Sequence, residues 1–241
     1  LSSFTCPDVK IETLHLDNNH LETISMDNCS VDYMVITSNN LKWLHFHSDL
    51  KGLIASKNNI KSFIVNEPSS LYHMEMTENE DISHIFPTLK TLSQLLHLNL
   101  SNSFIGVLPE NAFSQMTSLK YLHLKSCGIQ IIPIEAFSSN TNLLTLDLSE
   151  NALETIDLHM FNGLEKLSYL DISGNKLSQI ENIDKIKDAL PSLGEIKINR
   201  NPWKCLSLST MLRTLNQLKI KISETEEKHF EVQNILGHPC Y

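Results

Sequence analysis

The sequence predicts an α/β repeat fold, a solenoid whose stacked coils form a parallel sheet along the concave side, because three features coincide. A short apolar pattern recurs at nearly constant spacing, asparagine follows it at a fixed position, and cysteines lie close to both ends of the chain. Apolar residues make up 41% of the 241 residues, which is enough to build a continuous core. The seven glycines and eight prolines are too few for a loop-rich sandwich.

The recurring pattern follows the frame L-x-x-L-x-L-x-x-N-x-L and matches the chain nine times. This frame defines the leucine-rich repeat, a horseshoe-shaped solenoid in which each unit contributes one short strand. Alternate side chains of the L-x-L core point inward, and neighbouring units stack because one unit cannot bury its apolar face alone. The asparagine position of the nine copies is occupied by Asn19, Asn39, Asn58, Asn79, Ser103, Cys127, Asn151, Asn175 and Asn201.

Each asparagine of the frame is expected to point into the bend after its strand. There its amide can satisfy backbone groups of its own and adjacent coils, which would otherwise be buried without partners. Ser103 can fill part of this role, and Cys127 can fill it only weakly. We therefore predict that Cys127 is a buried, unpaired structural residue, in preference to a reactive thiol.

Two kinds of repeat divide the chain. Successive frames are 20, 19 and 21 residues apart, then 24 residues apart four times and 26 once. The longer units contain phenylalanines at 24-residue intervals, which predict a stacked row under the convex side: Phe113, Phe137 and Phe161. The shorter units carry alternating apolar pairs, which predict a second short strand on the convex side: Ile24 with Met26, Leu44 with Phe46, and Phe63 with Val65.

Atypical segments flank the repeats, and terminal coils need such segments to cover their exposed core. We expect an N-terminal cap at residues 1–10, leucine-rich repeats at 11–201 (units of 19–21 residues, then of 24) and a C-terminal cap at 202–241. In the C-terminal cap we expect an alternating apolar stretch over 218–222. Before it, a short amphipathic helix is predicted from four apolar positions: Leu208, Met211, Leu212 and Leu215.

Four of the five cysteines lie at the two ends, and we predict that they form two disulfides. Cys6 and Cys29 precede adjacent strands, which lie about 5 Å apart, so a bridge between them is sterically plausible. A bridge from Cys205 to Cys240 would hold the cap over the last coil and is worth about 3–4 kcal/mol in the chain-entropy model. Bridges at both ends, with Cys127 left inside the ladder, indicate an oxidising compartment and hence a secreted or extracellular protein.

Two N-glycosylation sequons, at Asn28 and Asn99, agree with this compartment, although such triplets also arise by chance in a chain rich in serine and asparagine. The formal net charge of −9 argues against a general nucleic-acid binder. No apolar run approaches the roughly 20 residues that cross a bilayer, so no membrane insertion is expected. The abrupt start at Leu1, without a signal peptide, is interpreted as a processed or trimmed chain.

An enzyme is not expected. The sequence contains no G-x-S-x-G, H-E-x-x-H or phosphate-binding glycine loop. Carboxylates such as Glu75, Asp147 and Asp171 fall on distant coils and are not paired across a cleft. We therefore predict no catalytic residue and no cofactor.

The segment Asn201-Pro202-Trp203-x-Cys205 resembles the C-terminal cap of extracellular leucine-rich-repeat proteins. The single cysteine after the tryptophan, together with the mixture of short and 24-residue repeats, resembles the mosquito leucine-rich-repeat immune proteins. This resemblance implies a secreted role in insect innate immunity, with a complement-like thioester-containing protein or another leucine-rich-repeat protein as partner. Members that bind such partners carry a C-terminal coiled coil, and no heptads occur before Tyr241.

Two alternative functions stay open. The chain could be the ectodomain of a cell-surface receptor or adhesion protein, or it could be an intracellular scaffold; the cysteines and sequons disfavour the scaffold.

The solvent-facing positions of the strands form columns along the concave face. Rings beside carboxylates are favoured at protein-binding surfaces, so we predict a binding surface there. It comprises Tyr33, His73, Glu75, His97, Tyr121, His123, Asp147, Tyr169 and Asp171. The alternative is that these residues only fill the face, and a glycan on Asn99 would shift binding to the edges or the convex loops.

Three histidines, His73, His97 and His123, fall on adjacent coils and could approach one another. A metal site or a pH-sensing patch is therefore conceivable, because imidazole ligates metals and titrates near pH 6.5. Solvated surface histidine is the simpler interpretation, and no metal is predicted.

Overall fold

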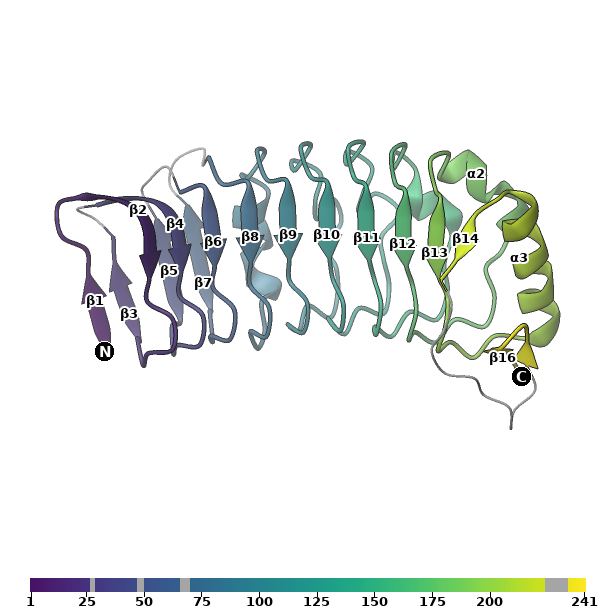
Figure 1. Ribbon diagram of the computed structural model, residues 1–241, viewed down its shortest axis with the longest axis horizontal. Helices are drawn as coiled ribbons and strands as arrows, with labels where there is room; N and C mark the ends of the chain where they lie inside the picture. The colour runs from purple at the N-terminus through teal and green to yellow at the C-terminus, as the bar shows by residue number, and fades with distance from the viewer. Residues whose placement is uncertain (27–28, 47–49, 66–69, 224–233) are drawn as a thin grey trace.

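The computed structural model describes residues 1–26, 29–46, 50–65, 70–223 and 234–241. A ten-stranded parallel sheet runs along one side of an elongated solenoid (Figure 1). Its strands are β2 (Lys10–His15), β4 (Ser30–Val35), β6 (Gly52–Ile54), β8 (His73–Glu75), β9 (His97–Asn99), β10 (Tyr121–His123), β11 (Thr145–Asp147), β12 (Tyr169–Asp171), β13 (Glu195–Lys197) and β14 (Lys221–Ile222). The first nine are the strands of the nine frames, which confirms the predicted leucine-rich-repeat solenoid.

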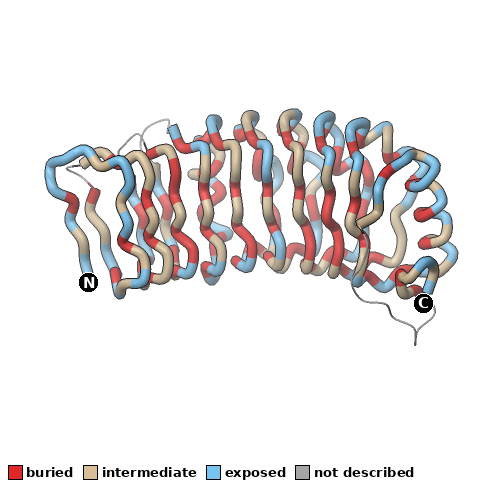
Figure 2. Tube along the Cα trace, viewed as in Figure 1, coloured by how far each residue is buried: buried red, intermediate tan, exposed pale blue. Residues whose placement is uncertain are grey.

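The coils stack in register, so equivalent residues of successive frames lie beside one another. The central strand residues Leu98, Leu122 and Leu146 pair across β9, β10 and β11, and all three are fully buried. Such residues form one continuous core along the solenoid, visible as the buried positions of Figure 2. The flanking strand residues point to the other side of the sheet, which is the concave face.

The convex side changes character along the chain, as the two repeat types predict. Short strands occupy it in the N-terminal coils: β1 (Ser3–Thr5), β3 (Thr23–Ser25), β5 (Trp43–Phe46) and β7 (Ser62–Val65). They form two separate parallel pairs, β1 with β3 and β5 with β7. Strand β1 was not predicted, because it lies before the first frame; its Phe4 pairs with Ile24, so the cap region already contributes a convex strand.

Short helical turns take over the convex side in the later coils. They are η1 (Ser83–Ile85), α1 (Phe86–Leu89), η2 (Leu158–Phe161), η3 (Ile183–Lys185) and α2 (Ile186–Ala189). The predicted phenylalanine row is buried beneath them: the rings of Phe113 and Phe137 stack with centroids 5.7 Å apart, and Phe161 is 1% exposed. The row starts one coil earlier than predicted, since Phe86 packs edge-on against Phe113 at 5.9 Å.

The asparagine ladder forms as predicted. The Nδ2 of Asn151 donates to the carbonyls of Leu124 (2.8 Å) and Leu148 (3.0 Å), and its Oδ1 accepts from the amides of Cys127 (2.9 Å) and Ile129 (3.0 Å). One side chain thus ties its own coil to the preceding one. Equivalent buried asparagines, each bonded to the carbonyls of two coils, are Asn39, Asn58, Asn79, Asn175 and Asn201.

Serine and cysteine fill the two exceptional positions of the ladder. The Ser103 hydroxyl donates to the carbonyl of Met76 (2.9 Å) and accepts from the amide of Asn79 (3.0 Å). The Cys127 thiol makes two weaker contacts, to the carbonyls of Leu100 (3.3 Å) and Lys125 (3.4 Å). It is buried and unpaired, and burial raises the pKa of the Cys127 thiol to about 12. An inert structural thiol is what the frame predicted.

Disulfides close both ends, with the pairing that the sequence predicts. Cys6 bonds Cys29, with Cα atoms 5.8 Å apart, and Cys205 bonds Cys240, with Cα atoms 4.9 Å apart. Helix α3 (Cys205–Gln217) covers the last coil and buries the four predicted apolar residues. Of the alternating stretch that follows, only Lys221–Ile222 forms a strand, β14, which extends the sheet beside β13.

Two further strands complete the C-terminal segment. Strands β15 (Asn234–Ile235) and β16 (His238–Pro239) form an antiparallel pair near α3 (Figure 1). The buried ring of Trp203 donates from Nε1 to the carbonyl of Ile198 (2.8 Å) and so anchors the start of the cap. Among the described residues, no helix combines the length and the apolar character that crossing a bilayer requires.

Candidate protein-binding face

The nine residues predicted for the binding surface all lie on strands of the large sheet, beside a buried central residue. Tyr33 is in β4, His73 and Glu75 in β8, His97 in β9, Tyr121 and His123 in β10, Asp147 in β11, and Tyr169 and Asp171 in β12. All nine therefore belong to one face, but the structure divides them into groups with different surroundings.

The first group is a cluster of rings on three adjacent strands, and we call it the ring cluster: His73, His97, Tyr121 and His123. His97 stacks on His73 with centroids 4.5 Å apart, and it contacts the edges of Tyr121 at 6.0 Å and His123 at 5.4 Å. The parallel register sets His73, His97 and Tyr121 directly opposite one another. The sequence placed these rings in one column, and the structure brings them into contact.

The half-buried His97 lies at the centre of the ring cluster. Burial, and secondly the imidazoles of His73 and His123, lower the pKa of His97 to about 4. The ring is therefore neutral at physiological pH. Glu75 lies next to it, with its carboxylate 3.0 Å from Nε2 of His73. The ligand atoms of His73, Glu75 and His97 lie within 4.8 Å of one another, so these three side chains are the candidates for holding a metal ion.

The second group consists of Asp147 and Asp171, whose carboxylates accept hydrogen bonds from their own coils. Asp147 accepts from the backbone amide of Ser149 (2.9 Å), and Asp171 accepts from the backbone amide (2.9 Å) and hydroxyl (2.6 Å) of Ser173. Asn99 makes the same contact with the amide of Ser101 at 3.0 Å. These are Asx turns that end the strands. The prediction treated the two aspartates as binding groups, whereas the structure gives both a role in the bend.

Tyr169 stands beside this second group. Burial, and then the nearby carboxylates of Asp171 and Asp147, raise the pKa of Tyr169 to about 12. Its hydroxyl consequently keeps its proton over the physiological range and remains a hydrogen-bond donor.

Tyr33 belongs to a third group that sequence reasoning identified only in part. Its ring lies over Gly52, where a Cβ atom would come within 2.7 Å of the ring. Across the coil of Gly52 it reaches Tyr72, two coils further on, with hydroxyls 2.5 Å apart and ring centroids at 6.3 Å. A hollow of about 220 Å³ lies beside them, lined also by Ile54 and His73. Gly52 was the signal in the sequence, because it is the one position of its column without a side chain.

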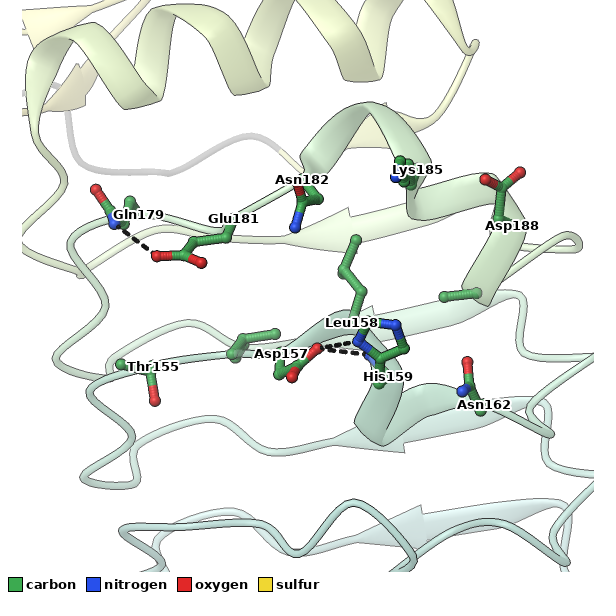
Figure 3. A pocket seen from close by; sticks show the side chains of 12 residues that line it. Thr155, Asp157, Leu158, His159, Asn162, Gln179, Glu181, Asn182, Lys185 and Asp188 are labelled. Carbon is green, nitrogen blue, oxygen red and sulfur yellow. Dashed lines mark hydrogen bonds and ion pairs between the residues drawn. The ribbon is translucent and has the colours of Figure 1, made fainter.

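A larger cavity, of about 490 Å³, lies away from this face, against η2, η3 and α2 (Figure 3). Four of its polar side chains are bonded within their own segments. Asp157 accepts from the backbone amide (2.9 Å) and Nδ1 (2.7 Å) of His159 and caps η2, and Gln179 donates to Glu181 at 3.4 Å. No convergence of free polar groups is seen in this part of the described structure, so we do not assign it a ligand.

An exposed apolar patch is the competing surface for a protein partner. It consists of Phe104, Val107, Ile131 and Ile134, which are 57%, 83%, 74% and 54% exposed. Phe104 also packs on Gly128 of the next coil, where an added Cβ atom would lie 2.9 Å from its ring. These residues follow the ladder position and lie outside the sheet, at the rim of the concave face. Substitutions there distinguish binding at the rim from binding on the concave face.

The comparisons with known proteins concern the repeats. The leucine rich repeat family matches residues 69–129 and 117–177. The crystal structure of the leucine-rich repeat domain of APL1B has a TM-score of 0.67 at 18% identity, over 100% of this chain and 72% of that chain. The structure of the Leptospira interrogans LRR protein LIC12759 has a TM-score of 0.64 at 22% identity, over 88% of this chain and 60% of that one. The sequence matches no curated protein. At these identities the likeness shows the fold alone.

Proposed function

We propose that this chain, a solenoid of leucine-rich repeats, is a secreted protein-binding module that holds its partner on the concave face. The observation that carries this proposal is the ring cluster on β8, β9 and β10. Four rings in contact on hydrogen-bonded strands present a large, preorganised area, and aromatic side chains dominate the energetics of many protein interfaces. The pair of Tyr33 and Tyr72 extends this area along the same face.

The setting we propose is insect innate immunity, with the chain recognising or scaffolding immune factors. The resemblance of the cap and of the mixed repeat lengths to the mosquito leucine-rich-repeat immune proteins supports this setting, and the likeness to the leucine-rich repeat domain of APL1B agrees with it at the level of the fold. The partner would be a complement-like thioester-containing protein or another leucine-rich-repeat protein. Secretion is supported by the two disulfides, which persist in oxidising compartments.

The two predicted glycosylation sites bear on which surface is free. Asn28 lies outside the described residues. Asn99 lies on β9 next to the ring cluster, so a glycan there would cover the proposed face. Its side chain already bonds the amide of Ser101, and Leu100 between them is fully buried. We propose that Asn99 is left unmodified, and intact mass spectrometry of the secreted protein tests this.

The alternative is that the chain forms the ectodomain of a cell-surface receptor or adhesion protein. The same disulfide-closed ends suit both roles. Fractionation of cells that express the natural full-length gene separates them, because a receptor stays with the membranes and a secreted protein enters the medium.

Capture from haemolymph tests the binding face. Wild-type protein and two variants, Tyr121→Ala and Val107→Ser, are immobilised at equal density, and bound proteins are quantified by mass spectrometry. Tyr121 is 40% exposed, so its loss should leave folding intact. A hot-spot residue contributes upward of about 2 kcal/mol, so the partner should be lost with Tyr121→Ala. It should be retained with Val107→Ser, and the opposite pattern would move the site to the rim.

A further inference from the structure

We propose that His73, Glu75 and His97 form a binding site for one zinc ion on the concave face, with a fourth coordination position open to water or to a partner's side chain. The proposal is independent of the protein-binding function, because it concerns only the ion and three side chains of this chain.

The backbone geometry favours the site. His73 and Glu75 are two residues apart on β8 and therefore point to the same face, and His97 lies directly opposite His73 on β9. The hydrogen bonds of a parallel sheet fix all three Cα positions. Two imidazole nitrogens and one carboxylate oxygen are the three protein ligands of many open zinc sites. Among the described residues, no other three histidine, cysteine or carboxylate side chains bring their ligand atoms within 4.8 Å of one another.

The side chains need only a small adjustment to coordinate. His73 Nε2 and Glu75 Oε1 are 3.0 Å apart, which is close to the spacing of two ligands on one zinc ion with bonds of about 2.0–2.2 Å. The rings of His73 and His97 are stacked, at an angle of 15°, so one ring must turn to direct its lone pair at the same ion. Rotation about χ2 of histidine is broad, and both side chains are only partly buried.

The surroundings of one ring nitrogen of His97 favour the ion as well. Its Nδ1 is buried and has no hydrogen-bond partner among the described residues, which is rare for a buried polar atom. Coordination through this nitrogen would satisfy it. The carboxylate of Glu75 adds negative charge beside the ion.

Calorimetric titration with zinc chloride tests the site. The protein is first treated with EDTA and dialysed, and the wild type is compared with His97→Ala, Glu75→Gln and a matched control, His159→Ala. His159 forms a similarly close pair with Asp157, at 2.7 Å, but within the described part of the chain it belongs to no group of three ligand side chains. We expect one zinc ion per chain for the wild type and the control, and binding at least about tenfold weaker for the two site variants.

Thermal melting supplies a second readout that does not depend on the heat of binding. Zinc should raise the melting temperature of the wild type by mass action and raise that of Glu75→Gln less at the same zinc concentration. Melts without zinc establish that each variant is folded. Absence of saturable 1:1 binding to the wild type, or equal affinities in all four proteins, would overturn the proposal and leave His73 and Glu75 as an ordinary ion pair.

Discussion

At the scale of single residues, the ladder side chains decide whether adjacent coils stay joined. Each buried amide makes several hydrogen bonds to backbone groups of two coils inside the bend, so its energetic effect exceeds that of one surface hydrogen bond. The sequence was sufficient to predict this, because the asparagine recurs at a fixed distance from apolar positions. It was also sufficient to predict the buried thiol of Cys127, which stands where the amide is expected.

Asn151→Ala is expected to lower the free energy of unfolding by about 1–3 kcal/mol, because it leaves the amides of Cys127 and Ile129 and the carbonyl of Leu124 buried without their partner. Thermal melts or urea titrations measure this change. The control is Glu154→Ala, an exposed residue three positions later, which should melt with the wild type. Equal stability of Asn151→Ala and the control would contradict the ladder's role.

Residues in the left-handed conformation could not be predicted from the frame. The residue before each ladder position has positive φ, as at Lys57 (56°), Ser126 (55°), Glu150 (56°) and Gly174 (65°). The frame leaves this position unspecified, and only one of the nine copies uses glycine there. The bend that aims each asparagine into the coil is therefore enforced by packing and not by local backbone preference.

At the scale of elements, the steric cost of the left-handed residue in each bend can be measured by substitution. Ser126→Gly should stabilise the protein by about 1 kcal/mol, since glycine adopts the left-handed region without the steric penalty of a Cβ atom. Gly174→Ala should destabilise it, because the new methyl group meets both that penalty and the Glu150 carboxylate at 2.7 Å. Melting temperatures that move in the same direction for both variants would contradict this explanation.

The elements differ in how well the sequence predicts them. Nine strands and helix α3 follow from clear periodicity, because alternate apolar positions and the spacing of Leu208, Met211, Leu212 and Leu215 reflect their geometry. The turns η1 to η3 and helices α1 and α2 have three or four residues each, which is too short for a helical period to show. The convex strands were predicted in position, but not their division into two separate pairs.

At the scale of the whole molecule, stacking converts sequence columns into a continuous surface. The frame alone predicted which side chains share the concave face, whereas the ring contacts of His97 with His73, Tyr121 and His123 are seen only in the structure. It could not show that Asp147 and Asp171 are taken up by Asx turns, because the bonding amide is contributed by the backbone two residues later. Nor did it identify Tyr72, which lies outside the columns and is reached by Tyr33 only because Gly52 lacks a side chain.

The central claim is that a partner covers the ring cluster and the Tyr33–Tyr72 pair. Hydroxyl-radical footprinting of the chain, free and bound to the partner captured from haemolymph, tests it most directly, because the method reports the exposure of individual side chains. We expect reduced oxidation of Tyr33, Tyr72, His73 and Tyr121 in the complex, with Phe104 and Ile131 oxidised as in the free protein. Protection of Phe104 and Ile131, with Tyr72 and Tyr121 oxidised at the free rate, would contradict it.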